Sequence, residues 1–411
     1  MPIHPEHTWG HTLAFGEEYY RNAVKLISAI RADTPILTEV SAKVVEALRA
    51  GHNVYANVTT GHMPTYELVN EREGNPAQFI FNGNDANTPE EYADMGPGDV
   101  LFTNRVSNEV KAARDAGAYV VVYTTCYVNN RWTPPGEVHP NEDDLMPEDV
   151  ASRVIESHIP WKQGLLHIPQ IPEMPVFPGS ANGSCTIHWM ITAEVAHAIA
   201  TGDMPDGARG REYADILIER LSDMFALEFD RMKAVAPTIA KRIIDGGHYF
   251  MQSGNEGVKS ESWGVAAGLM LANAFEPRPT ADGGNKDVTL IAAVNTHDAQ
   301  ELTWTDEART NGHYIVGIGP AEHDDLRSRC DVYFSNQCAE PGGVLSIPGR
   351  DEKICPTTGV MNNVMMQMFS AQFVDEMCRR GAVPYFYMGG YRTVGGPYNE
   401  LSRKFFDERG Y

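Results

Sequence analysis

Cysteine is scarce in this sequence, and so are the short motifs that identify common enzyme classes. The 411 residues include six cysteines, and none of them forms a CxxC pair. This usage argues against a disulfide framework and favours reduced, buried thiols. Walker, HExxH, GxSxG and GxGxxG patterns are also absent. Kinases, zinc proteases, esterases and Rossmann dehydrogenases therefore receive little support.

Positive charge and long apolar runs are also in short supply. The chain has 33 Lys and Arg against 55 Asp and Glu, for a net charge of −22. Such a charge repels nucleic-acid backbones and anionic lipids. No run of roughly 18 apolar residues occurs, and the opening residues lack the pattern of a signal peptide. We therefore expect a cytoplasmic protein that binds neither nucleic acid nor membrane.

What the sequence does contain is a series of strand and helix units. The runs 52–59, 99–104 and 118–128 are short and rich in β-forming residues. Residues 109–118, EVKAARDAGA, lie between the last two runs and have helical composition. The continuous apolar residues of YVVVY are typical of a strand that is covered on both faces, as in a parallel sheet. These features predict a βαβ unit.

The second half repeats the same order of elements. The segments DVLF…AARDAGAYVVVYT (99–124) and DVTL…EARTNGHYIVGIG (287–319) share Asp-Val at the strand start, Ala-Arg before the helix end and a glycine before the next strand. Each half also ends in a long helix. We therefore predict a duplicated α/β architecture with domains at 1–205 and 206–411, separated by a segment rich in Gly, Pro and Asp.

Three segments carry a resemblance to a known family: ALRAGHNVYANVTTGHM (47–63), 96–125 and 156–199. They resemble the sugar isomerase (SIS) family, and the order of elements is similar to the tandem SIS domains in the isomerase part of glucosamine-6-phosphate synthase. Nearly the whole chain follows that order, although only the first half matches in letters. The resemblance implies two flavodoxin-like domains, each a parallel sheet flanked by helices, with a sugar phosphate at the carboxyl ends of the strands.

The first ligand loop implied by this resemblance contains Thr59, Thr60 and Gly61. Hydroxyls and backbone N–H groups in such a loop present converging donors to a phosphate or a polyol. The family's second phosphate loop has the form Ser-x-Ser-Gly, whereas this chain has TNRVSNE, with Arg105 and Ser107 and no glycine. We expect these residues to bind the ligand.

The matching loop of the second half departs further from the family pattern. It reads NTHDAQE (295–301), with His297 and Asp298 where the family has Ser and Gly. A carboxylate opposes a phosphate at short range. Either the ligand is not phosphorylated, or only the first half binds phosphate, with Arg105 as the local cation. The sequence leaves both alternatives open.

Aldose–ketose isomerisation through an enediol needs a base that moves a proton between adjacent carbons and a group that opens the sugar ring. The resemblance implies a catalytic glutamate after the loop that begins at residue 253, where Glu261 is preferred to Glu256 and Glu67 is the first-half counterpart. A solvated first-turn carboxylate is the alternative interpretation of Glu261. For ring opening we consider the histidines expected near strand ends or helix starts: His62, His248 and His297.

Further polar residues in glycine-rich segments are predicted to bind substrate: Ser180, Ser253, Gly254 and Arg392. Arg392 lies in YFYMGGYRTVGGPYN, whose aromatic rings and guanidinium suit a sugar or an anion. Docking of the chain end is the alternative role for that segment. His4, His7 and His11 have helical spacing, but Pro5 and Gly10 disfavour a helix there, and we expect no metal site.

The sequence thus predicts a cofactor-independent sugar or sugar-phosphate isomerase that forms a homodimer. SIS-type folds also host lyases and deglycases, and a non-catalytic sugar-binding regulator is an alternative from another class. The absence of a helix-turn-helix or a basic segment weighs against the regulator. A third possibility is that one half is purely structural.

Overall fold

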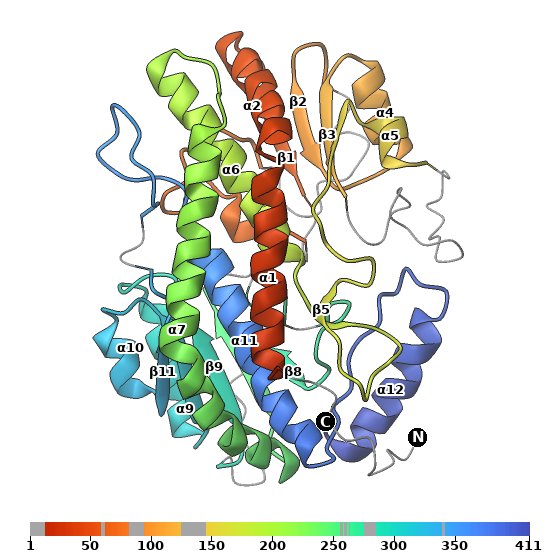
Figure 1. Ribbon diagram of the computed structural model, residues 1–411, viewed down its shortest axis with the longest axis vertical. Coiled ribbons are helices and arrows are strands. Elements are labelled where there is room, and N and C mark those ends of the chain that lie inside the picture. The colour runs from red at the N-terminus through yellow and green to blue at the C-terminus, as the bar shows by residue number, and fades with distance from the viewer. Residues whose placement is uncertain are drawn as a thin grey trace.

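Long helices run through the middle of the molecule and separate two sheets (Figure 1). In this computed structural model the described residues are 13–58, 62–81, 94–124, 145–254, 258, 261–262, 264–274, 285–338 and 342–411. The central helices are α1 (Phe15–Ala32), α2 (Thr34–Arg49), α6 (Ser180–Thr201), α7 (Ala208–Ile244) and α11 (Thr358–Arg379).

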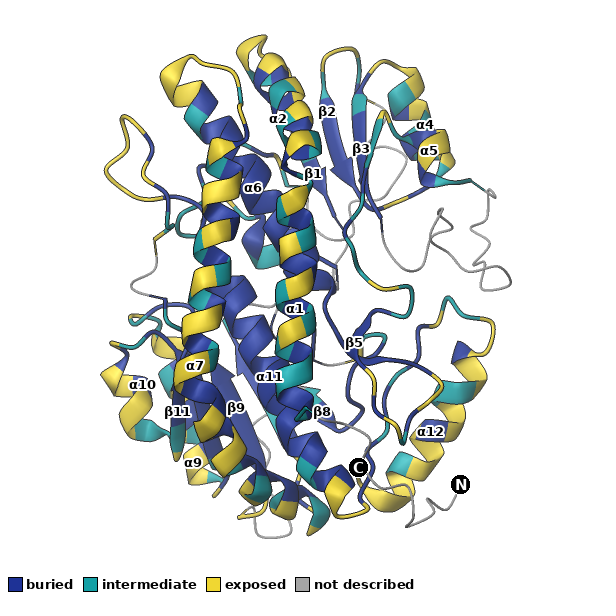
Figure 2. Ribbon diagram, viewed as in Figure 1, coloured by how far each residue is buried: buried dark blue, intermediate teal, exposed yellow. Residues whose placement is uncertain are grey.

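The central helices differ in how much of their surface is covered. Along α1 the buried residues Tyr19, Ala23 and Ile27 recur every four positions, which gives one apolar stripe and one exposed face. Helices α6 and α11 are instead buried on nearly every side, as their dark colour in Figure 2 shows. The starts of α6 and α11 therefore lie in the interior, where polar groups need partners.

The first sheet is parallel and has the strand order β1-β2-β3-β4 within the described residues. Alternate residues face opposite layers, so Leu101, Val120 and Val122 pack with α4 and α5, while Phe102 and Val121 join the central core. The elements of this half are β1 (Val54–Asn57), η1 (Thr65–Glu67), β2 (Val100–Thr103), α4 (Asn108–Asp115), β3 (Tyr119–Tyr123), α5 (Pro147–Val150) and β4 (Arg153–Ile155).

The second sheet is also parallel, with the order β11-β10-β9-β7-β8 among the described strands. Ile291 points toward α9 and α10, whereas Leu290 and Ala292 point toward the central helices. Its elements are β7 (Tyr249–Ser253), β8 (Ala272–Ala274), β9 (Val288–Ala292), α9 (Ala299–Thr310), β10 (Tyr314–Gly319), α10 (Asp324–Arg329) and β11 (Val332–Ser335). The predicted α/β class with two helix-flanked parallel sheets is confirmed.

One sheet lies in each half of the chain, but the helices of the halves are interleaved. Helix α1 packs against α7 and α11, and α6 packs against α7. The boundary between 1–205 and 206–411 therefore stays a prediction. The remaining elements are the antiparallel pair β5 (Gly164–Leu166) and β6 (Val176–Pro178) and the last helix α12 (Gly395–Arg409).

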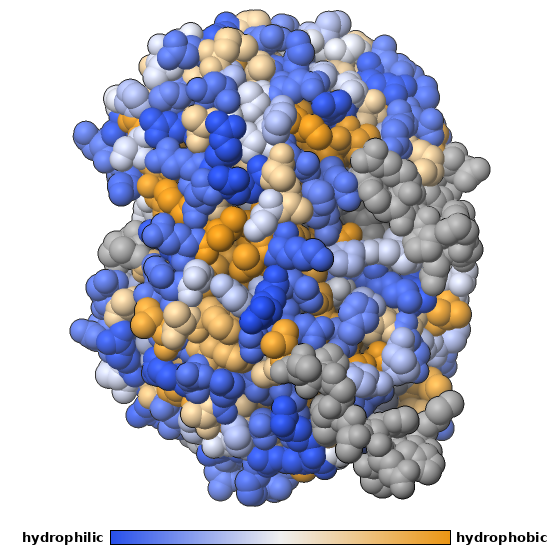
Figure 3. Space-filling model, in the orientation of Figure 1, coloured by the Kyte–Doolittle hydropathy of each residue, from blue (hydrophilic) through white to orange (hydrophobic). Residues whose placement is uncertain are grey.

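The face of the molecule shown in Figure 3 is largely hydrophilic, with hydrophobic side chains gathered over the middle of α1 and α7. Leu227 of α7 has 58% of its surface exposed. Tyr20 of α1 stacks on Phe225 of α7, with ring centroids 4.1 Å apart. The predicted homodimer stays a prediction. Among the described residues, no helix combines the length and the apolar character that a membrane crossing requires.

Candidate functional site

A buried carboxyl group lies at the start of α6. Glu261 is 1% exposed, and Ser180, the first residue of α6, donates a hydrogen bond from Oγ to its Oε1 over 2.9 Å. Burial raises the pKa of Glu261 to about 8, although the Ser180 hydroxyl and the Ala181 backbone N–H partly offset this effect. The structure thus brings together two predicted site residues that lie far apart in the sequence.

Residues of α1, α6 and α11 hold this carboxyl group in place. Gln367 of α11 donates to the backbone oxygen of Glu261 over 2.8 Å. Asn363 donates to Asn182 Oδ1 over 2.9 Å, and Asn182 donates to the Tyr19 hydroxyl over 3.2 Å. These amides are buried and tie the start of α6 to α11. Both halves of the chain therefore position the candidate base.

Glu67, the first-half counterpart, has a different set of neighbours. Its Oε1 lies 3.5 Å from Arg72 Nε, and its Oε2 accepts a 2.8 Å hydrogen bond from Trp189 Nε1. Arg72 in turn donates to Thr358 Oγ1 at the start of α11 over 2.6 Å. Glu67 and Arg72 have side chains that are 1% and 0% exposed. Glu67 is therefore one member of a buried ion pair that connects the two halves.

The three predicted histidines lie in different environments. His62 follows β1 and is buried, and desolvation lowers its pKa to about 4, so its ring is neutral near pH 7. His297 is 62% exposed and lies 3.1 Å from Glu73 Oε1. His248 precedes β7 and pairs with Asp287 at 3.0 Å. His248 thus lies at the amino-terminal edge of the second sheet, opposite the carboxyl edge where Ser253 and Gly254 lie, so the expectation that it lies beside them is wrong.

The predicted ligand residues of the first half lie at the carboxyl end of β2. The backbone N–H of Arg105 donates to Thr103 Oγ1 over 3.0 Å, which orders the turn after the strand. Ser107 caps α4, because its Oγ accepts from the Val110 backbone N–H. Three more residues predicted to bind ligand lie outside the described residues: Thr59, Thr60 and Gly61.

The remaining predicted ligand residues lie in two places. Ser253 ends β7, and its hydroxyl donates to the Ala292 backbone oxygen over 2.9 Å. Gly254 follows it, at the carboxyl end of the second sheet. Arg392 donates to the Met388 sulfur over 3.1 Å, in a segment whose Tyr391 hydroxyl donates to a backbone oxygen between β4 and β5. Arg392 is thus packed within the chain-end segment.

A second buried glutamate was not among the predicted site residues. Glu301 lies in the first turn of α9 and is 0% exposed. Burial is the main cause that raises its pKa to about 8, and the nearby Asp298 adds to it. A glutamate in the first turn of a helix is usually solvated, and its negative charge is stabilised there by the helix dipole. Only its place in the helix that follows the buried strand β9 could have indicated burial.

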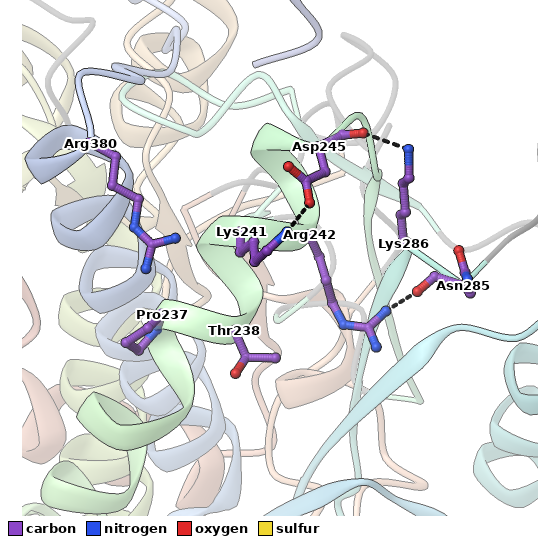
Figure 4. A pocket seen from close by; sticks show the side chains of 8 residues that line it. All are labelled: Pro237, Thr238, Lys241, Arg242, Asp245, Asn285, Lys286 and Arg380. Atoms are coloured by element: carbon purple, nitrogen blue, oxygen red, sulfur yellow. Dashed lines mark hydrogen bonds and ion pairs between the residues drawn. The ribbon is translucent and has the colours of Figure 1, made fainter.

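A shallow hollow at the opposite end of the second sheet has no part in this site (Figure 4). It measures about 530 Å³ and lies where α7 ends and the chain enters β9. Lys286 donates to the Asp245 backbone oxygen over 2.9 Å, and Lys241 pairs with the Asp245 carboxylate. Cations at the end of a helix stabilise its free carbonyl groups, so these residues have a structural explanation.

Nothing in the described part of the chain forms a group of three or more His, Cys, Asp or Glu side chains arranged to hold a metal ion. His4, His7 and His11 lie outside the described residues. The described cysteines are free thiols. The candidate site is thus built from Glu261, Ser180 and their amide partners.

No family model matches this chain. A UPF0309 protein from Streptomyces griseus is 23% identical over 140 residues, which are 31% of this chain and 55% of that protein. The match therefore spans about half the length of this relative.

Solved structures with a similar chain trace include a tagatose-6-phosphate ketose/aldose isomerase from Escherichia coli. It is 13% identical, with a TM-score of 0.45, and the match covers 90% of this chain and 94% of that one. The C-terminal domain of glucosamine-fructose-6-phosphate aminotransferase from Francisella tularensis is 11% identical, with a TM-score of 0.49 and coverage of 89% and 97%. Both scores lie below 0.5, so these likenesses say nothing about the substrate of this chain.

Proposed function

We propose that this protein is a cofactor-independent aldose–ketose isomerase of a sugar or sugar phosphate, with Glu261 as the base. The observation that supports this role is the environment of Glu261: it is 1% exposed, it is hydrogen-bonded to Ser180, and its pKa is raised to about 8. A general base works best when its pKa lies near the working pH. A solvated carboxylate, the alternative role, is inconsistent with this burial.

In the proposed reaction the Glu261 carboxylate removes the proton from the carbon beside the substrate carbonyl. The electron pair moves onto the carbonyl oxygen, which takes up a proton and gives an enediol. Glu261 then returns its proton to the former carbonyl carbon, while the hydroxyl on the deprotonated carbon gives up its proton and becomes the new carbonyl. Ser180 donates a 2.9 Å hydrogen bond to one carboxyl oxygen and so stabilises the ionised form of Glu261.

Ring opening is assigned to His62, because its ring is neutral and can both accept and donate a proton. His297 is the alternative at the second sheet. Thr59, Thr60 and Gly61, with Arg105 and Ser107, would hold the hydroxyl groups or the phosphate of the ligand. A local cation is required for a phosphate, since the chain as a whole carries a net charge of −22.

The test is hydrogen exchange at the reacting carbon. Hexoses and hexose 6-phosphates are incubated with the protein in D₂O, and deuterium at carbon 2 is followed by NMR, which detects enediol formation even when the net conversion is small. We expect exchange with wild type and its loss in Glu261→Gln. The matched control is Glu301→Gln, which alters a second buried glutamate whose pKa is also raised to about 8.

Other results would reject the isomerase. Equal exchange in wild type and Glu261→Gln would remove Glu261 from the chemistry. Release of a fragment without exchange at carbon 2 would point to a lyase or a deglycase. A rise in melting temperature with a sugar but no turnover would favour a non-catalytic binding protein.

A further inference from the structure

The start of α11 gathers two arginines and two threonines. Arg72 Nη2 donates to Thr358 Oγ1 over 2.6 Å, and Arg220 Nη1 donates to Thr357 Oγ1 over 2.7 Å. Thr357 is the residue before the helix and Thr358 is its first residue, and no side chain caps the first turn. The two guanidinium groups thus meet the same helix end, Arg72 from the segment that follows η1 and Arg220 from α7.

Arg72 is the more unusual of the two cations, because it is 1% exposed. Its Nη2 bonds Thr358 and its Nε faces Glu67 at 3.5 Å, but within the described residues its Nη1 has no hydrogen-bond acceptor. A buried donor without an acceptor costs free energy, and the cost is larger for a charged group. Nη1 therefore offers a strong donor beside the helix end.

The charges at this helix end favour an anion. The first turn of a 22-residue helix carries a partial positive charge. Glu67 balances one guanidinium, and the described residues contain no ion pair for Arg220. Arg72 lies over the ring of Tyr66, and the other carboxyl groups near that ring are Glu73, which pairs with His297, and Glu301, whose protonated form is favoured by burial. Repulsion between cations and a helix start is relieved by a bound anion.

The start of α6 differs from the start of α11, because a carboxyl group accepts hydrogen bonds there. There the carboxyl group of Glu261 accepts hydrogen bonds from Ser180 and the Ala181 N–H. At α11 the corresponding glutamate, Glu67, bonds Trp189 in the body of α6 instead. The first turn of α11 thus has cations and hydroxyls around it and lacks a capping carboxylate.

We propose that the start of α11 is a second binding site, for a small oxyanion such as a phosphate group. Its donors are Arg72 Nη1, the Arg220 guanidinium and the first backbone N–H groups of α11, a combination that suits tetrahedral oxyanions. Arg220 is partly exposed, so the site is reached from its side. This site is separate from the Ser180–Glu261 pair and does not depend on the proposed reaction.

The test uses inorganic phosphate as the probe. Binding to the full-length protein is measured by titration calorimetry and by thermal shift, at constant ionic strength with chloride as the reference anion. Arg220→Gln is the test variant, because its side chain lies at the edge and its loss should leave the fold intact. The matched control is Arg209→Gln, which alters a partly exposed arginine of the same helix that pairs with Glu212.

We expect wild type and Arg209→Gln to bind phosphate alike, and Arg220→Gln to bind it about tenfold more weakly because a charge-assisted contact is lost. Arg220→Lys should recover part of the affinity. Equal phosphate binding in Arg220→Gln and wild type would overturn the proposal, as would a response no greater than that to chloride.

A second arm identifies the source of the phosphate group. If Arg220→Gln weakens hexose 6-phosphate and inorganic phosphate together, the site holds the phosphate of a sugar. If only inorganic phosphate is weakened, the site holds the free anion. Glu261→Gln should leave inorganic phosphate binding unchanged, so failure of this proposal and failure of the isomerase are distinguished.

Discussion

Two glutamates from opposite halves of the chain are both buried, but their partners differ. Glu261 faces the Ser180 hydroxyl and a backbone N–H, it forms no ion pair with a cation in the described part of the chain, and burial raises its pKa to about 8. Glu67 has the guanidinium of Arg72 at 3.5 Å and the indole N–H of Trp189 at 2.8 Å. The two buried glutamates thus differ in their partners: Glu261 bonds a hydroxyl and a backbone N–H, whereas Glu67 pairs with Arg72, which bonds Thr358 in the second half.

The largest expected effect is on catalysis at Glu261. Glu261→Gln removes the proton acceptor but keeps the shape and the hydrogen bond to Ser180. A positioned general base contributes about 10²- to 10⁴-fold, so kcat for the proposed isomerisation should fall by that factor, with circular dichroism unchanged. Folded Glu67→Gln protein should retain most of its kcat. Equal losses in the two variants would contradict a single site.

Replacing Glu67 should instead lower the stability of the folded protein. Glu67→Gln leaves the Arg72 guanidinium buried without its partner charge, which costs about 3–5 kcal/mol of unfolding free energy. Replacing both partners, as Glu67→Leu with Arg72→Met, should recover much of that loss because no buried charge remains. Denaturant unfolding measures both. A double variant as unstable as the single one would show that the pair is not the source of the effect.

Another effect concerns the pH dependence of stability and activity. Glu261 and Glu301 have folded pKa values of about 8 against ordinary values of 4.5. Between these values the folded chain holds protons that the unfolded chain has released, so stability falls as pH rises from about 5 to 8. The melting temperature should decrease over that range, and less steeply in Glu261→Gln and in Glu301→Gln. Activity should rise with pH over the same interval, because only the ionised Glu261 is a base.

Much of the fold could be predicted from local patterns in the sequence. The run YVVVY predicted a strand covered on both faces, and residues 119–123 form β3 in the middle of a parallel sheet. The helix before it was indicated by its composition and is α4. These elements are determined by residues that are neighbours along the chain, so they can be predicted from a single sequence.

The chemistry of the site depends on contacts that no local pattern reveals. Glu67 and Trp189 are separated by 122 positions, and Ser180 and Glu261 by 81. The resemblance to sugar isomerases pointed to Glu261, but it gave no sign that Arg72 neutralises the matching glutamate. Glu301 was missed because a glutamate early in a helix is usually solvated. Burial in the folded protein is the main cause of the raised pKa of Glu261 and of Glu301, and the spacing of residues along the sequence does not predict that burial.

The smallest predicted effect sharpens the role of the hydroxyl at the start of α6. Ser180→Ala removes the hydrogen bond that stabilises the ionised form of Glu261, so the pKa of Glu261 should rise further. The pH at which kcat/KM reaches half its maximum should move upward by about one pH unit, while kcat at high pH stays near the wild-type value. Ser180→Thr keeps the hydroxyl and should keep the wild-type profile. A fall in kcat at every pH, with no displacement of the profile, would instead assign Ser180 to substrate binding, because a ligand contact is lost equally in both ionisation states of Glu261.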